Sequence, residues 1–173
     1  MKRVKLVVAY DGTNYCGWQV QPNGITIEGV LNRELSKLLK EDIVVIGASR
    51  TDSGVHSYGN VAVFDTNARM PAEKISYALN QRLPDDIVVQ NSSEIPLDWH
   101  PRHCNSRKTY EYRILNREFP MPQRRLDTWF VYRKLNIPAM CEAAEQFEGT
   151  HDFKSFCMAV SAEGKSTMRN VFS

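Results

Sequence analysis

The sequence predicts an α+β fold in which helices pack on one mainly antiparallel sheet. In the first half of the chain, short β-branched or alternating runs are interleaved with two amphipathic segments of helical length. Turn-forming residues separate these segments. The chain has 173 residues, of which 42% are hydrophobic, which is enough for one substantial core, or for one core and part of another.

The first strand is expected over residues 4–10, where an apolar run ends at the turn chemistry of Asp11-Gly12-Thr13-Asn14. Residues 27–40 then carry apolar side chains at helical spacing. Thr26 is the expected N-cap, and Glu28 adds a negative charge to the first turn. This segment is therefore expected to be an amphipathic helix.

Two strands and a second helix are expected next. Residues 43–46 are β-branched throughout, which predicts a buried strand over 43–48, and residues 59–65 predict the strand after it. Pro71 is expected to open a helix that runs to Leu83, and residues 86–90 predict one further strand. The resulting order, β-α-β-β-α-β, is that of the ferredoxin-like unit.

The stretch 99–134 differs from the rest in charge. The whole chain has 22 Lys and Arg against 20 Asp and Glu, a net charge of only +2, so global charge does not announce a nucleic-acid partner. This stretch alone holds nine basic residues against three acids, with aromatic residues between them. Such a surface can bind phosphates and stack on bases. The alternative is a strand whose basic residues face solvent and whose aromatic residues face a core.

The remaining elements are a strand over residues 108–115 and a helix over 138–148. Asn136 is the expected cap of this helix, and Gly149 is expected to end it. Asp152 follows His151, but two such side chains make a weak metal site, and we expect Asp152 to cap the next turn. A further strand is expected near Arg169.

The connection between the strands at 43–48 and 59–65 brings together a guanidinium, a carboxylate and an imidazole, from Arg50, Asp52 and His56. Catalytic side chains concentrate on loops that a rigid scaffold holds. The alternative is a plain turn at Asp52-Ser53-Gly54, in which the aspartate bonds its own backbone and the glycine takes a positive φ. Without its flanks, this tripeptide favours the turn.

The flanking residues favour a site. The segment Arg50-Thr51-Asp52-x-Gly54-Val55-His56 resembles the nucleophile motif of the pseudouridine synthases, in the branch of tRNA pseudouridine synthase A. Ser53 and Ser57 replace the other small residues that are usual in this family. Segments 10–21, 107–113, 149–156 and 165–171 resemble further family motifs in the same order, so that the resemblance runs from about residue 4 to the end of the chain.

The resemblance implies a pseudouridine synthase fold and an enzyme that isomerises uridine at positions 38, 39 and 40 of the tRNA anticodon stem-loop. The reaction transfers no group to another molecule, so neither a cofactor nor a metal is expected. The partners implied are tRNA and a second copy of the chain. Asp52 would be the nucleophile, and the residues expected to bind the substrate are Tyr110, Arg50, His56, Arg107 and Lys108.

The resemblance also implies two halves, residues 1–98 and 99–173. The family continues with a helix resembling F-L-x-x-M-V-R, which this sequence lacks, so the second half is expected to be incomplete and the chain truncated. Two alternatives stay open. One is a tRNA-binding fragment with impaired catalysis, and the other is a ferredoxin-like domain that binds a small molecule, which the element order alone would support.

The location expected for the chain is the cytoplasm. The four cysteines are scattered, with no C-x-x-C pair and no ligand-like spacing to histidine, and free thiols in a reducing compartment are the simplest account. The apolar run near the N-terminus is too short for a signal peptide and is broken by Lys5. No segment of the sequence is long and apolar enough to cross a bilayer.

Overall fold

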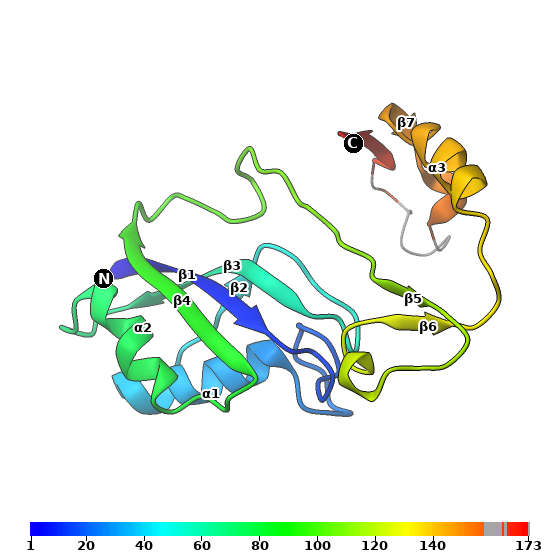
Figure 1. Cartoon of the computed structure of the whole chain (residues 1–173). Coiled ribbons are helices and arrows are strands. Elements are labelled where there is room, and N and C mark those ends of the chain that lie inside the picture. The colour runs from blue at the N-terminus through cyan, green and yellow to red at the C-terminus, as the bar shows by residue number, and fades with distance from the viewer. Residues whose placement is uncertain (158–163, 165, 173) are drawn as a thin grey trace. The chain divides into compact units, whose positions relative to one another are not determined.

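The computed structural model describes residues 1–157, 164 and 166–172, and the chain divides into two compact units (Figure 1). The N-terminal unit is Met1–Thr109 and the C-terminal unit is Tyr110–Ser173. The N-terminal unit extends through Thr109 because the chain beyond residue 98 stays bonded to it. Arg3 Nη1 donates to the carbonyl oxygen of Trp99, and Arg102 Nε donates to that of Gly47. The expected division into domains at residues 98 and 99 stays a prediction.

The N-terminal unit is built on one four-stranded sheet. Its strands are β1 (Lys2–Tyr10), β2 (Ile46–Gly47), β3 (Ser57–Thr66) and β4 (Ile87–Ile95). The spatial order is β2-β3-β1-β4, and every neighbouring pair is antiparallel. The predicted α+β fold with a mainly antiparallel sheet is therefore confirmed for this unit.

Two helices cover one face of this sheet, α1 (Ile27–Leu39) and α2 (Ala72–Asn80) (Figure 1). The predicted N-cap is confirmed, because Thr26 Oγ1 accepts a hydrogen bond from the backbone N–H of Gly29 at 3.2 Å. Pro71 is the N-cap of α2 rather than its first helical residue, and the helix ends three residues before the predicted Leu83. The core lies between helices and sheet, and its largest side chains include Phe64, Trp18, Leu31, Leu35 and Ile75.

The strand predicted over residues 43–48 is mostly wrong, since only Ile46 and Gly47 pair with β3. The reason is that polar side chains of α1 satisfy the preceding backbone donors. The N–H of Ile43 donates to Ser36 Oγ at 2.9 Å, and the N–H of Val45 donates to Asn32 Oδ1 at 2.8 Å. The apolar run is still anchored on the core, because Ile43 and Val45 are buried.

The C-terminal unit consists of small separate pieces. In one of them β5 (Ile114–Asn116) pairs in parallel with β6 (Trp129–Val131), and a 3₁₀ turn at Pro122–Arg124 lies between these strands in the chain. In the other, β7 (Gly149–Asp152) pairs antiparallel with β8 (Met168–Val171), and α3 (Ile137–Glu145) precedes them. The strand expected near Arg169 is confirmed.

The strand predicted over residues 108–115 is wrong except for its last two residues. Residues 107–113 have the alternation of a strand, but among the described residues 107–112 have no partner strand, and a strand without a partner leaves its backbone groups unpaired. The caps fare better. Asn136 Oδ1 accepts from the N–H of Ala139 at 3.2 Å, and Asp152 Oδ1 accepts from the N–H of Lys154 at 3.0 Å, so both predicted caps are confirmed.

The two units differ in burial. The N-terminal unit has one contiguous core, whereas no described residue of the C-terminal unit is buried. None of the helices in the described ranges has the length and apolar character that a membrane span requires.

Candidate active site

The loop between β2 and β3, residues 48–56, holds the candidate nucleophile and is called here the nucleophile loop. The N–H of Val55 donates to the carbonyl oxygen of Asp52 at 3.2 Å, and Gly54 has a φ of +78°, so the predicted turn exists. The side chain of Asp52 takes no part in this turn, which uses only its backbone carbonyl. The Asp52 side chain is exposed, and within the described parts of the chain its carboxylate has neither a hydrogen bond nor an ion pair. The carboxylate is thus available to a ligand.

Residues 10–21, the second family-like motif, lie against the nucleophile loop and are called here the brace. The N–H of Trp18 donates to the carbonyl oxygen of Thr51 at 3.0 Å. The carbonyl oxygen of Tyr15 accepts from the N–H of Gly54 and from Ser53 Oγ, both at 3.2 Å. These hydrogen bonds to backbone carbonyls fix the residues on both sides of Asp52. The backbone that carries the Asp52 carboxylate is therefore held in place by the brace.

The brace approaches the loop so closely that one position admits only glycine. Gly17 has a φ of +81°, and a Cβ at this residue would overlap the carbonyl oxygen of Thr51. The tight contact explains why the brace needs a glycine directly before its tryptophan.

The aromatic residues of the brace belong to the core. Tyr10, Tyr15 and Trp18 are all buried. The two tyrosine hydroxyls have different partners, one on the loop and one just before β4. The hydroxyl of Tyr10 lies 2.9 Å from Thr51 Oγ1, and the hydroxyl of Tyr15 donates to a carboxylate oxygen of Asp86. Burial, followed by the bond to Asp86 and its charge, raises the pKa of Tyr15.

Arg50 stands two residues before Asp52 and is exposed. Its Nη1 donates to Gln19 Oε1 of the brace at 3.1 Å. No ion pair joins Arg50 to Asp52 in the portion of the chain described here. The guanidinium therefore does not hold the carboxylate in this structure, and it has donors left over for another acceptor.

His56 closes the loop against the start of the brace. Its Nδ1 lies 3.1 Å from the N–H nitrogen of Gly12 and 3.0 Å from Asp11 Oδ1. A neutral ring with an unprotonated Nδ1 accepts from Gly12, whereas a protonated ring donates to Asp11, so both states tie His56 to the brace. Hydrogen bonds from Thr13, with a smaller contribution from His56, lower the pKa of Asp11. A contact of His56 with substrate stays a prediction.

The structure brings Asp52, Arg50 and His56 together on one loop. Arg107 and Lys108 are exposed on an irregular segment of the same N-terminal unit. Tyr110 opens the C-terminal unit and is 85% exposed. Substrate contacts of these three residues stay predictions.

Sequence reasoning missed one residue beside the loop. Arg102 Nε donates to the carbonyl oxygen of Gly47 at 2.8 Å, immediately before the nucleophile loop begins. The sequence placed Arg102 only within a basic stretch. A long-range contact between a side chain and a backbone carbonyl leaves no local pattern that could have singled it out.

Comparisons with known proteins identify the family. The sequence model of the tRNA pseudouridine synthase family matches residues 6–103. A protein named tRNA pseudouridine synthase A from Thermoanaerobacter sp. (strain X514) is 48% identical over 172 residues, which is 99% of this chain and 70% of that protein. The chain belongs to the tRNA pseudouridine synthase family.

Other relatives in this family give the same result. Proteins named tRNA pseudouridine synthase A are 45% identical in Ruminiclostridium cellulolyticum and 44% identical in Citrifermentans bemidjiense. They are matched over 99% and 100% of this chain, and over 70% and 69% of their own lengths. The family match at residues 6–103 contains the nucleophile loop, the brace and Arg102.

Proposed function

We propose that this chain isomerises uridine to pseudouridine in tRNA, with Asp52 as the nucleophile. The observation that supports this most directly is the exposed carboxylate of Asp52. It has no hydrogen bond or ion pair among the described residues, and it lies on a loop that the brace holds in place. The turn consumes backbone groups only, so Asp52 has no structural duty among the described residues. A family whose named members modify tRNA supplies the reaction.

The chemistry requires a nucleophile that can attack and then leave. In the isomerisation the bond between C1′ of the ribose and N1 of uracil breaks, and a bond between C1′ and C5 forms. The proton on C5 is released and N1 gains one, so the atoms of the nucleoside balance without an oxidant or a group donor. A carboxylate is ionised at neutral pH, and it can both attack the nucleoside and leave it again.

The proposed targets are the uridines at positions 38, 39 and 40 of the anticodon stem-loop. A paired uridine must leave its stem, which costs a few kcal/mol of stacking and pairing. Arg50 is proposed to occupy the vacated space, since its guanidinium is exposed next to Asp52 and keeps free donors. Tyr110 is proposed to stack on the extruded uracil, and its exposed ring suits such a contact.

The proposed grip on tRNA is electrostatic. Arg107 and Lys108 are exposed, and so are most of the aromatic rings that follow in this stretch, namely those of Tyr110, Tyr112, Phe119, Trp129 and Tyr132. This exposure favours the interpretation of residues 99–134 as an RNA-binding surface over a buried strand face. A homodimer and a cytoplasmic location complete the proposal, and the free state of all four cysteines agrees with a reducing compartment.

Release of tritium tests the reaction. The chain is incubated with tRNA that carries tritium at C5 of its uridines, and the label released to water is counted. Release is expected with this tRNA and is expected to stop when cytidine replaces uridine at positions 38, 39 and 40. Equal release from both tRNAs would contradict the proposed target positions.

A second candidate is a tRNA-binding chain with impaired catalysis. The absence of any buried residue in the described part of the C-terminal unit favours it, because Tyr110 lies in that unit and has no packed support. Salt-sensitive tRNA binding without any release of tritium would establish this candidate and exclude turnover.

A further inference from the structure

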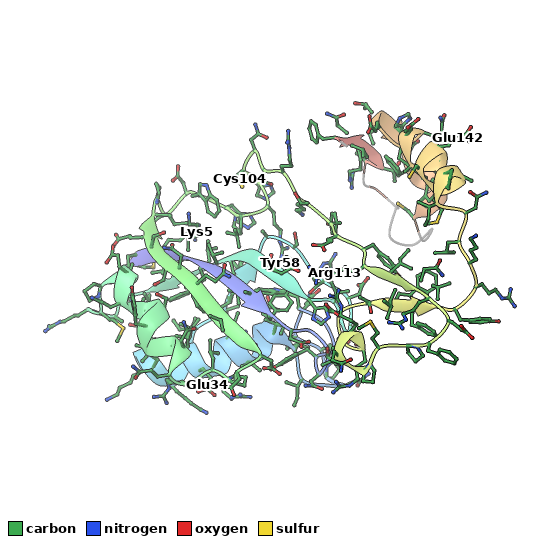
Figure 2. All side chains as sticks on the ribbon, viewed as in Figure 1. Lys5, Glu34, Tyr58, Cys104, Arg113 and Glu142 are labelled. Atoms are coloured by element: carbon green, nitrogen blue, oxygen red, sulfur yellow. The ribbon has the colours of Figure 1, made fainter. Side chains whose placement is uncertain are left out.

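The chain beyond β4 crosses the face of the sheet that the helices leave open. It leaves Ile95 on β4, at one edge of the sheet, and Arg102 bonds Gly47 on β2, at the other edge. Between them, the carbonyl oxygen of Trp99 accepts from Arg3 on the central strand β1. Figure 2 shows Cys104, on this crossing segment, and Glu34, on α1, on opposite sides of the sheet. The crossing segment is residues 96–108.

The middle of the crossing segment is fixed at a rigid point, where Arg102 bonds Gly47. Gly47 lies on Trp18 so closely that a Cβ at this position would overlap the indole ring. Trp18 is itself buried in the core. The bond from Arg102 Nε therefore holds the guanidinium against a part of the chain that cannot shift easily, immediately before the nucleophile loop.

The guanidinium of Arg102 keeps its Nη donors for another molecule. Its Nη groups make no hydrogen bond or ion pair within the described ranges, and the side chain is exposed. A planar fork with four free N–H groups fits a phosphate in two-point fashion.

The surroundings of Arg102 are electropositive. Residues 99–110 contain no Asp or Glu, whereas they contain Arg102, Arg107, Lys108 and two histidines. The His100 and His103 rings are 4.5 Å apart. Partial burial, and then the charges of His103, Arg102 and Arg3, lower the pKa of His100. Asp98 is the one acid of the crossing segment, so an anion that approaches residues 99–108 meets several cations and no carboxylate of those residues.

We propose that Arg102 binds a backbone phosphate of the tRNA strand that carries the target uridine. Its bond to Gly47 then ties the position of that phosphate to the nucleophile loop. This inference rests on the proposed function, because it takes tRNA as the ligand. It adds a substrate-binding residue that positions the strand with respect to Asp52.

The salt dependence of tRNA affinity tests the proposal. Each phosphate contact adds about 0.7 to 0.9 to the slope of log Kd against log salt. Arg102→Gln removes the charge but leaves an amide that can still donate to Gly47, so its slope is expected to fall by about this amount with little change in Tm. Arg69→Gln is the matched control, since Arg69 is exposed, has no described partner and follows β3 at the end away from the nucleophile loop.

A second variant keeps the test decisive if Arg102→Gln fails to fold. Arg102→Lys retains the charge but not the planar fork, and it is compared with the parent on stem-loops that carry one neutral methylphosphonate each. We expect one phosphate whose neutralisation weakens binding of the parent more than binding of Arg102→Lys. Identical profiles for the two proteins would contradict a two-point contact between the planar fork of Arg102 and a phosphate.

The outcomes separate this inference from the proposed function. The phosphate contact is overturned if Arg102→Gln has the same slope of log Kd against log salt as the parent. It is also overturned if Arg69→Gln lowers this slope as much as Arg102→Gln does. A parent chain that binds tRNA but releases no tritium overturns the proposed reaction, and the binding slopes still decide the role of Arg102. Affinity for tRNA that does not depend on salt overturns the phosphate contact and the electrostatic grip on tRNA, and leaves the reaction to the tritium assay.

Discussion

At the scale of single residues, several aspartates hold the fold through their carboxylates, and Asp52 does not. Asp11, Asp65 and Asp86 each accept a hydrogen bond from a neighbouring side chain, whereas Asp52 accepts none from the described residues. A side chain without a structural duty is free to serve a ligand. The sequence could predict Asp52 as the candidate from its flanks, but it could not show that the turn leaves its carboxylate unused.

The hydrogen bond between Tyr15 and Asp86 gives a first prediction. Tyr15→Phe is expected to lower the free energy of unfolding by about 1 to 2 kcal/mol at neutral pH, because it removes the hydroxyl and with it the hydrogen bond to the charged Asp86 carboxylate. Urea denaturation measures the loss. Tyr77→Phe is the control, since Tyr77 is exposed and no described hydrogen bond uses its hydroxyl. An equal loss in the control would contradict the assignment.

The raised pKa of Tyr15 fixes the sign of a pH effect in the same pair of proteins. Above pH of about 10 the unfolded chain gives up the tyrosine proton while the folded chain keeps it, so the parent loses stability as the pH rises. Tyr15→Phe lacks this contribution. The difference in unfolding free energy between parent and variant is therefore expected to shrink above pH 10, and a constant difference would contradict it.

At the scale of elements, the brace and the nucleophile loop form one structural piece although they lie about thirty residues apart in the chain. From the sequence, both segments resembled motifs of the family, and they followed one another in the order that the family has. The sequence could not predict their contact, because the bonds from Trp18 and Gly54 run between backbone groups, which carry no sequence signal. The brace follows β1 and the loop precedes β3, and the pairing of these two strands brings brace and loop together.

Two glycines with nearly the same backbone conformation test this contact. Gly17 and Gly54 both have a positive φ, at +81° and +78°, but only Gly17 touches the opposing backbone, and a Cβ on Gly54 meets open space. Gly54→Ala is expected to cost about 1 to 2 kcal/mol of strain. Gly17→Ala adds a clash and is expected to cost at least about 2 kcal/mol more. Equal losses in thermal or chemical denaturation would argue against the brace.

The wrong strand predictions have one cause. A β-branched or alternating run indicates that a segment suits a sheet, but it does not predict which acceptors its backbone N–H groups will find. At residues 43–45 they go to Ser36 and Asn32 of α1. At residues 107–112 no described strand pairs with the chain. Caps and helices were predicted better, since their partners lie three or four residues away.

At the scale of the whole molecule, the two units are expected to differ in stability. Burial of apolar surface is the dominant stabilising term, and the described C-terminal unit has no buried residue. Amides of β5, β6 and α3 are therefore expected to exchange at least about a hundredfold faster than those of β1 and α1. Hydrogen exchange followed by mass spectrometry measures this, and equal protection in both units would contradict the prediction.

The most direct test of the account is the effect of Asp52→Asn on tritium release from tRNA labelled at uridine C5. An amide cannot act as the nucleophile, so the rate is expected to fall by roughly a thousandfold or more. The free energy of unfolding is expected to change by less than about 0.5 kcal/mol, because the side chain has no described contact. Asp85→Asn, which changes another exposed aspartate, is expected to keep the parent rate. Comparable release from Asp52→Asn and the parent would contradict the assignment of Asp52 as the nucleophile.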